Sequence, residues 1–151
     1  MLTKRTSEKT SPSGKKVLVT RAGDQATALA AALAEIGVNP VVVPTIEIIP
    51  PASFVELDQA IADLDQVDYL ILTSVNAVNA FFDRLVAQGR NPQALSAIQT
   101  VAVGPKSAEA LVERGVTADL IPQDYRAEGV VALLKDRVSG KRLLYPKAAL
   151  A

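Results

Sequence analysis

The chain has 151 residues, a length typical of one domain, with 49% hydrophobic and 21% charged residues. It contains no histidine and no cysteine, which excludes Ser-His-Asp and Cys-His nucleophilic catalysis, Cys/His zinc sites, haem bound through either residue and redox-active thiols. Any chemistry must use carboxylates, hydroxyls, Lys, Arg, Tyr or the backbone. The missing cysteine fits a reducing compartment, and we expect a cytoplasmic protein.

The formal net charge is zero, but the charges are unevenly distributed. Residues 1–16 hold five basic residues and one acidic residue, whereas the other 135 hold 11 basic and 15 acidic ones. A net acidic globular part argues against nucleic-acid binding, and no run of residues is apolar for long enough to span a membrane. We expect residues 1–16 to be a disordered basic arm or linker, with a tether to an anionic surface as the alternative.

From Lys16 onward, short apolar runs alternate with amphipathic segments. The expected strands are rich in Val, Ile and Leu, as parallel strands buried on both faces should be; they cover 17–20, 41–49, 69–73, 100–103, 119–121 and 142–145. Helices are expected where apolar residues recur every three or four positions, over 26–36 and 54–64, after Ser74, from Pro105 to Gly115, and from Ala127 to before Gly140. This alternation predicts the α/β class with a doubly wound parallel sheet.

Residues 38–51 interrupt this pattern, because four prolines flank or break one extended stretch. Proline removes ladder donors and keeps the preceding residue extended. We interpret 38–52 as a connector that leaves one lobe and enters another; a kinked edge strand is the alternative. Residues 17–37 would then be the first βα unit of one lobe and 53–147 a complete second lobe. A single βα unit cannot bury both faces, so it needs a partner from the second lobe, another chain or further sequence.

Candidate site residues follow the expected strands, since ligands of open parallel sheets bind at the carboxyl ends of the strands, beside helix N-termini. Hydroxyls, small residues and scattered Arg or Lys dominate these loops. Each also has a structural explanation: Ser74 and Ser107 can be helix caps, Glu128 can complement a helix dipole, and Tyr125 can be a packing residue. No G-x-G-x-x-G or G-x-x-x-x-G-K-[ST] motif is present, and no two acids occupy neighbouring strand ends, which disfavours dinucleotides, P-loop chemistry and metal catalysis.

Several segments together resemble the uroporphyrinogen-III synthase (HemD) family. They run in order from Val17 to Lys147: VLVTRAGDQATALAAALAEIGVNPVVVPTIEIIP, DYLILTSVNAVNAFF, TVAVGPKSAEAL, ERGVTADLIP, YRAEGVVALL and KRLLYPKA. Each motif is weak alone, but their order and spacing make the match specific. The resemblance implies two flavodoxin-like α/β lobes joined by a two-stranded connector, of which 148–151 would start the returning strand, and no metal or organic cofactor.

The reaction implied by this resemblance is that of a hydro-lyase in tetrapyrrole (haem, sirohaem and cobalamin) biosynthesis. Hydroxymethylbilane is cyclised to uroporphyrinogen III with inversion of ring D and loss of water. The substrate carries eight carboxylates, for which helix N-termini and Arg or Lys are natural receptors. The alternative function is a non-catalytic flavodoxin-like module that binds anions.

The resemblance also assigns substrate-binding positions, whereas the catalytic residues stay unknown. Ser107 stands where the family more often has Thr, and Lys147 stands where many members have Arg. The positions carried over are Arg21, Thr73, Ser74, Asn76, Gly104, Ser107, Tyr125, Glu128 and Lys147.

One departure concerns length, because the family continues beyond the point matched by Ala151, re-enters the first lobe and carries there a Tyr associated with loss of water. We therefore expect a truncated chain that is inactive or nearly so by itself. The basic arm would suit a linker from an upstream fused methyltransferase domain, and residues 17–37 could add to the sheet of a second copy in a swapped homo-oligomer.

Overall fold

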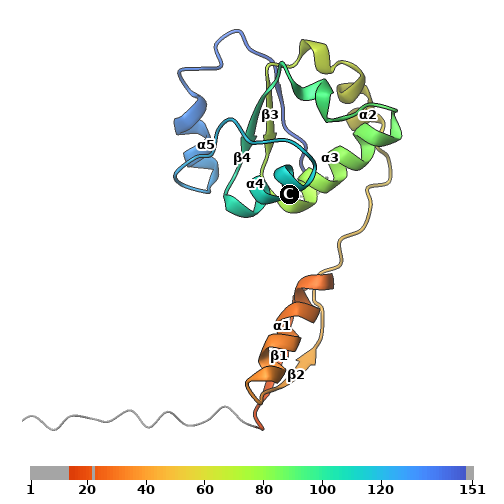
Figure 1. The fold of residues 1–151 in the computed structure, drawn as a ribbon, viewed down its shortest axis with the longest axis vertical. Helices are drawn as coiled ribbons and strands as arrows, with labels where there is room; N and C mark the ends of the chain where they lie inside the picture. Colours follow the sequence, from red (N-terminus) through yellow and green to blue (C-terminus); the bar gives the residue numbers. More distant parts are fainter. Residues whose placement is uncertain (1–13, 22, 149–151) are drawn as a thin grey trace, which may run out of the picture. The chain divides into compact units, whose positions relative to one another are not determined.

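The computed structural model describes residues 14–21 and 23–148. The expected basic arm and the expected start of the return connector therefore lie almost wholly outside the described residues. The chain divides between Pro50 and Pro51 into two compact units, which are described separately below (Figure 1).

The first unit is a βαβ motif. Strand β1 (Lys16–Val19) is followed by helix α1 (Gly23–Glu35) and strand β2 (Asn39–Val42), and the two strands are parallel, with Val17 opposite Pro40. Gly37, at φ +80°, turns the chain out of α1, and the Val38 N–H bonds to the carbonyl of Leu33 at 3.1 Å. A left-handed glycine just after a helix is a common helix stop.

Strand β2 differs from the expectation. We expected a strand over 41–49 within a connector over 38–52, but the strand covers Asn39–Val42 and includes Pro40. The N–H groups of Asn39 and Val43 bond to the carbonyls of Lys15 and Val19 at 2.8 and 2.9 Å. Since alternate residues of a strand point their N–H groups to opposite sides, the Pro40 nitrogen faces away from β1, where its missing hydrogen breaks no ladder bond.

The second unit is a parallel sheet with helices on both faces (Figure 1). Strands β3 (Tyr69–Leu72), β4 (Gln99–Ala102) and β5 (Leu143–Leu144) pair in the order β4-β3-β5. The helices are α2 (Val55–Ala62), α3 (Val75–Ala87), α4 (Pro105–Glu113) and α5 (Ala127–Leu134), with short 3-10 turns at Leu64–Gln66 and Pro92–Leu95. The predicted doubly wound α/β class is confirmed.

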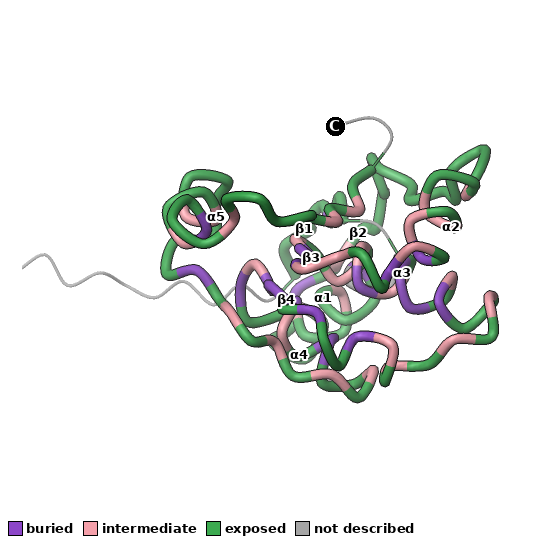
Figure 2. Tube along the Cα trace, turned by 90° about the horizontal axis from the view of Figure 1, so that it is seen from above, coloured by how far each residue is buried: buried purple, intermediate pink, exposed green. Residues whose placement is uncertain are grey.

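Strand β3 forms the centre of the core, since all four of its residues are buried (Figure 2). Leu70 and Leu72 pack with α2, α3 and α4, where Phe81 and Phe82 meet edge to face at 5.5 Å between ring centroids. The alternate residues Tyr69 and Ile71 pack on the other face, against α5 and the segment after it. Burial on both faces explains why β3 is a continuous apolar run in the sequence.

The expected strand over 119–121 is reduced to a single bridge between Leu120 and Val101. The carboxylate of Asp119 accepts the Thr100 N–H at 2.7 Å and the Thr100 hydroxyl at 2.9 Å. A side chain thus takes a β4 donor that a regular strand would have paired through its backbone. The expected strand over 142–145 is also shorter, at Leu143–Leu144.

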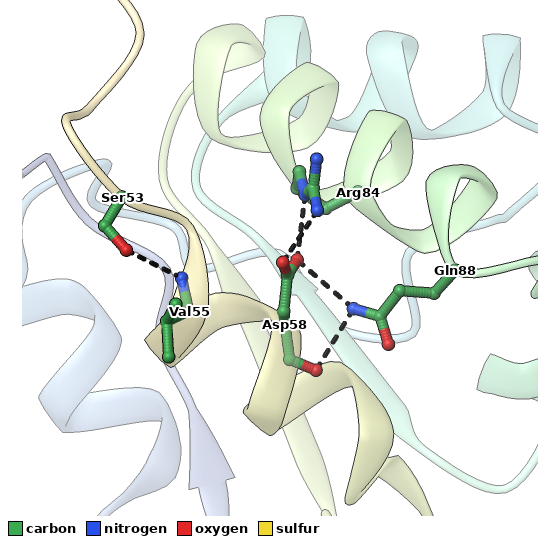
Figure 3. Close-up of polar contacts among 5 residues, drawn as sticks. All are labelled: Ser53, Val55, Asp58, Arg84 and Gln88. Atoms are coloured by element: carbon green, nitrogen blue, oxygen red, sulfur yellow. Dashed lines mark hydrogen bonds and ion pairs between the residues drawn. The ribbon is translucent and has the colours of Figure 1, made fainter.

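Helix α2 is fastened to α3 by an ion pair (Figure 3). The Asp58 carboxylate accepts from Nε and Nη2 of Arg84 at 2.8 and 2.6 Å, and Gln88 donates to the Asp58 carbonyl at 3.1 Å. The guanidinium also lies 4.8 Å from the ring centroid of Phe54. The hydrogen bond from Arg84 holds the pKa of the Asp58 carboxyl below its ordinary value and raises the pKa of Arg84.

Candidate functional site

The candidate site lies at the carboxyl edge of the second unit's sheet. Because β3, β4 and β5 are parallel, the loops that follow them leave the sheet at the same edge. These loops and the helix starts that follow them carry Thr73, Ser74, Asn76, Gly104, Ser107 and Lys147. The structure therefore brings these six expected residues to one edge.

The loop after β3 presents hydroxyl and amide groups at the start of α3. Ser74 is extended at φ −156°, and its Oγ accepts the N–H of Ala77 at 3.1 Å, as an N-cap does. Since this oxygen acts as an acceptor, its own O–H stays able to donate to a ligand. Ser74 and Asn76 are exposed and Thr73 is half-buried.

The loop after β4 turns sharply at Gly104, which has φ +93° and ψ 165°. These angles are essentially restricted to glycine. Pro105 then opens α4, where its missing N–H is harmless. Ser107 is buried, and its hydroxyl donates to the Val103 carbonyl at 3.3 Å. Its hydroxyl is thus engaged inside the fold, which leaves the backbone as its contribution to the edge.

Tyr125 lies against the Gly104 turn. A Cβ at Gly104 would come within 3.4 Å of the Tyr125 ring, yet 57% of this tyrosine is exposed. Glu128 is exposed in the first turn of α5. Tyr125 is therefore the one expected residue of the third loop with a defined contact to the second.

Gly129 is a residue that the sequence reasoning missed. A Cβ at this position would overlap the carbonyl oxygen of Asp124 and lie 2.8 Å from the carbonyl carbon. The loop before α5 can therefore fold back onto the helix only if residue 129 has no side chain. A glycine in the first turns of a helix, where it costs stability, was the signal that could have indicated this contact.

Two cationic side chains near this edge are paired with an acidic residue close by in the sequence, and a third is exposed. Lys106 bonds to Glu109 at 2.7 Å, and this hydrogen bond raises the pKa of Lys106. Arg126, also not predicted, lies 3.9 Å from Asp124 with 81% of its side chain exposed. Lys147 is exposed as well.

Arg21 belongs to the first unit. It follows β1 and is exposed. Its expected role in the site stays a prediction.

Across 14–21 and 23–148, no group of three or more acidic residues could hold a metal ion. Among the helices that the structure describes, none is long and apolar enough to cross a membrane.

These features define an α/β protein of the doubly wound class, with candidate ligand-binding loops at the carboxyl edge of a parallel sheet. A crystal structure of a mutant uroporphyrinogen III synthase from Thermus thermophilus shares this fold, with a TM-score of 0.61 and 18% identity over 87% of this chain and 60% of that one.

Residues 27–151 match the family model described as "Uroporphyrinogen-III synthase HemD". A uroporphyrinogen-III synthase of Synechococcus elongatus is 42% identical over 134 residues, which are 89% of this chain. The porphyrin biosynthesis protein HemD of Ruminiclostridium josui is 30% identical over 139 residues, or 91% of this chain. The chain therefore belongs to the uroporphyrinogen-III synthase HemD family, which confirms the resemblance. It spans 50% of the Synechococcus protein and 28% of the Ruminiclostridium protein.

Proposed function

We propose that this chain is part of a uroporphyrinogen-III synthase, a hydro-lyase that converts hydroxymethylbilane to uroporphyrinogen III in tetrapyrrole biosynthesis. The observation that carries the proposal is the family match over residues 27–151. The 42% identity to the Synechococcus synthase supports it. A non-catalytic anion-binding module, the alternative, is not favoured by these relatives.

The proposed reaction needs little covalent help from the protein. The hydroxyl of the hydroxymethyl group takes up a proton and leaves as water, driven by the electron pair of the pyrrole nitrogen, and its methylene carbon stays as an azafulvene that the pyrrole at the far end attacks. Because ring D ends inverted, the bond between ring D and its original methylene bridge must also break and form again at the other α carbon of ring D. Loss of a ring proton then restores the aromatic pyrrole. The protein's task is to hold a folded conformation in which ring D closes with inversion, and this task requires neither histidine nor cysteine.

The loops at the carboxyl edge are the proposed receptors of the substrate's carboxylates. The Ser74 hydroxyl can donate to an anion while its oxygen caps α3. Asn76 is exposed in the same helix start, and Lys147 is exposed after β5, the strand that neighbours β3. Gly104 and Ser107 would offer backbone N–H groups at the start of α4. We also assign Arg21, Thr73, Tyr125 and Glu128 to substrate binding, with Glu128 as an acceptor for pyrrole N–H groups because an ionised carboxylate cannot donate to another.

We further propose the division of the chain into lobes. Residues 17–37 would belong to one lobe and 53–147 to the other, with 38–52 leading between them, although part of this segment is strand β2. Because the chain spans about half of the Synechococcus relative, we propose that it has little activity alone.

A chimera tests the proposed function. The 134 matched residues of the Synechococcus synthase are replaced by those of this chain, and the 151-residue chain alone is assayed in parallel. After oxidation, chromatography separates type I from type III uroporphyrin. We expect type III product from the chimera and only spontaneous type I product from the chain alone. A folded chimera that yields type I alone would overturn the family reaction for this chain, and enzymatic type III product from the chain alone would overturn its dependence on a further half.

Three partner and location proposals accompany this function. We propose a cytoplasmic protein, supported by the cysteine-free composition.

We also propose that the basic residues 1–16 link the chain to an upstream methyltransferase domain, and that residues 17–37 can pair with a second copy. Light scattering that finds only monomers at high concentration would contradict the last proposal.

A further inference from the structure

Tyr125 combines solvent exposure with a close contact to the Gly104 turn. A side chain on a surface loop usually samples several rotamers, and binding must then supply the entropy needed to fix it. Here the ring rests on the Gly104 turn, since a Cβ built there would be 3.4 Å from Cγ and 3.7 Å from both Cδ atoms. More than half of the side chain nevertheless stays open to solvent.

Two glycines create this arrangement from opposite sides. Gly104 provides a surface without a side chain, at a backbone geometry that other residues avoid. Gly129 lets the chain at Asp124 close onto α5, because a Cβ there would lie 2.8 Å from the Asp124 carbonyl carbon and 2.9 Å from its Cβ. Asp124 directly precedes Tyr125, so the position of its carbonyl determines where the tyrosine begins.

An exposed aromatic ring seated against the Gly104 turn suits a flat aromatic partner. Offset or edge-to-face contact between rings is favourable beyond the area that it buries, and a pre-positioned ring loses little conformational entropy on binding. Each pyrrole of the proposed substrate is a flat aromatic ring with carboxylate side chains, and the exposed guanidinium of Arg126 is next in the chain.

We propose that Tyr125 is a contact surface for one pyrrole ring of the substrate, and that Gly104 and Gly129 are the positioning residues that hold it there. The inference rests on the proposed function and names the subsite at which Tyr125 would act. The ligand class expected at this subsite is a carboxylate-bearing pyrrole.

The experiment uses porphobilinogen, a stable monopyrrole with one acetate and one propionate, as the probe for the 151-residue chain. NMR titration follows the Tyr125 ring resonances, assigned by comparison with Tyr125→Phe, and provides the dissociation constant. We expect the ring resonances to shift on saturation and Tyr125→Ala to weaken binding about fivefold. Tyr125→Phe keeps the ring and should change the affinity less than twofold.

The positioning role is tested by a double-mutant cycle. Gly129→Ala should weaken binding about as much as Tyr125→Ala, and the double variant should bind no more weakly than either single variant, because both changes remove one interaction. Gly140→Ala is the control: it adds a methyl group at another glycine, where φ is +71°, but into open space. It should lower stability and leave the affinity unchanged.

Three results would overturn the inference. These are unshifted Tyr125 resonances at millimolar porphobilinogen, full affinity of Tyr125→Ala, or losses that add in the double variant. None of them bears on whether the chimera forms the type III isomer, so a failure of this inference is distinguishable from a failure of the proposed function.

Discussion

Asp58 and Arg84 illustrate how a half-exposed ion pair can organise two helices. Both side chains are about 30% exposed, and the guanidinium donates two bonds to one carboxylate while it covers the Phe54 ring. Bidentate geometry and the extra donor of Gln88 make this pair stronger than an isolated surface pair.

The pair predicts a pH-dependent contribution to stability. The pKa of Asp58 is lowered in the folded chain, chiefly by the hydrogen bond from Arg84. Its contribution is therefore present above the pKa of the unfolded chain, about 3.9, and is lost as the pH falls through the folded value. Urea unfolding of the wild type and Asp58→Asn should show a stability difference at pH 7 that shrinks below about pH 4.

Asp65→Asn is the control for this prediction, because the Asp65 side chain is 87% exposed and lies 3.5 Å from its partner Arg90. Its difference from the wild type should be small at every pH. A constant difference for Asp58→Asn across the same range would contradict the assignment of the pair.

Ser107 shows how far a residue's role can be predicted from sequence. Its place after a strand and beside Gly104 indicated a helix start at the candidate edge, and the structure confirms that helix start. Where its hydroxyl points depends on packing between α4 and β4, which a single sequence does not contain. The burial of Ser107 and its bond to Val103 are therefore findings of the structure.

At the scale of elements, one threonine makes most of the side-chain bonds that hold the segment over 117–120 to β4. Thr100 is 2% exposed, and its hydroxyl lies 2.9 Å from the Asp119 carboxylate and 3.2 Å from the Thr117 carbonyl. The apolar residues Leu120 and Ile121 led to the prediction of a strand over 119–121, but periodicity carries no information about a side chain that competes for ladder donors. By contrast, α2 and α3 were predicted well, because the spacing of their apolar residues directly reflects which face is buried.

Thr100→Val should reduce the free energy of unfolding by about 1–3 kcal/mol, because it leaves a carboxylate and a carbonyl without their hydroxyl partner. Thr100→Ser keeps the hydroxyl and should cost less than Thr100→Val. The midpoint of urea unfolding measures both variants. A loss for Thr100→Ser as large as or larger than that for Thr100→Val would contradict the assigned role of the hydroxyl, because the methyl group would then contribute at least as much.

At the scale of the whole molecule, the two units differ in how completely their strands are buried. All four residues of β3 are buried, whereas in β1 only Val19 is. Leu18 is 60% exposed, and the apolar residues of β2 are also open to solvent. The sequence predicted both segments as similar apolar strands, because hydropathy alone does not tell which partners cover a strand.

This difference predicts unequal hydrogen exchange, since amides with few buried contacts exchange through low-energy local opening. The amides of β1 and β2 should exchange much faster than those of β3 and β4 under native conditions, as measured by NMR. Equal protection in both sheets would show that the first unit is as stable as the second.

Pro40 makes the two edges of the first unit's sheet unequal in their ability to pair with a further strand. With its nitrogen turned to the outer side of β2, the middle of that edge has no hydrogen to offer to another strand. The opposite edge, along β1, keeps the N–H groups of Lys16 and Leu18. Because the outer edge of β2 lacks this donor, a regular ladder that extends this sheet is favoured beside β1, which leaves β2 as a border strand.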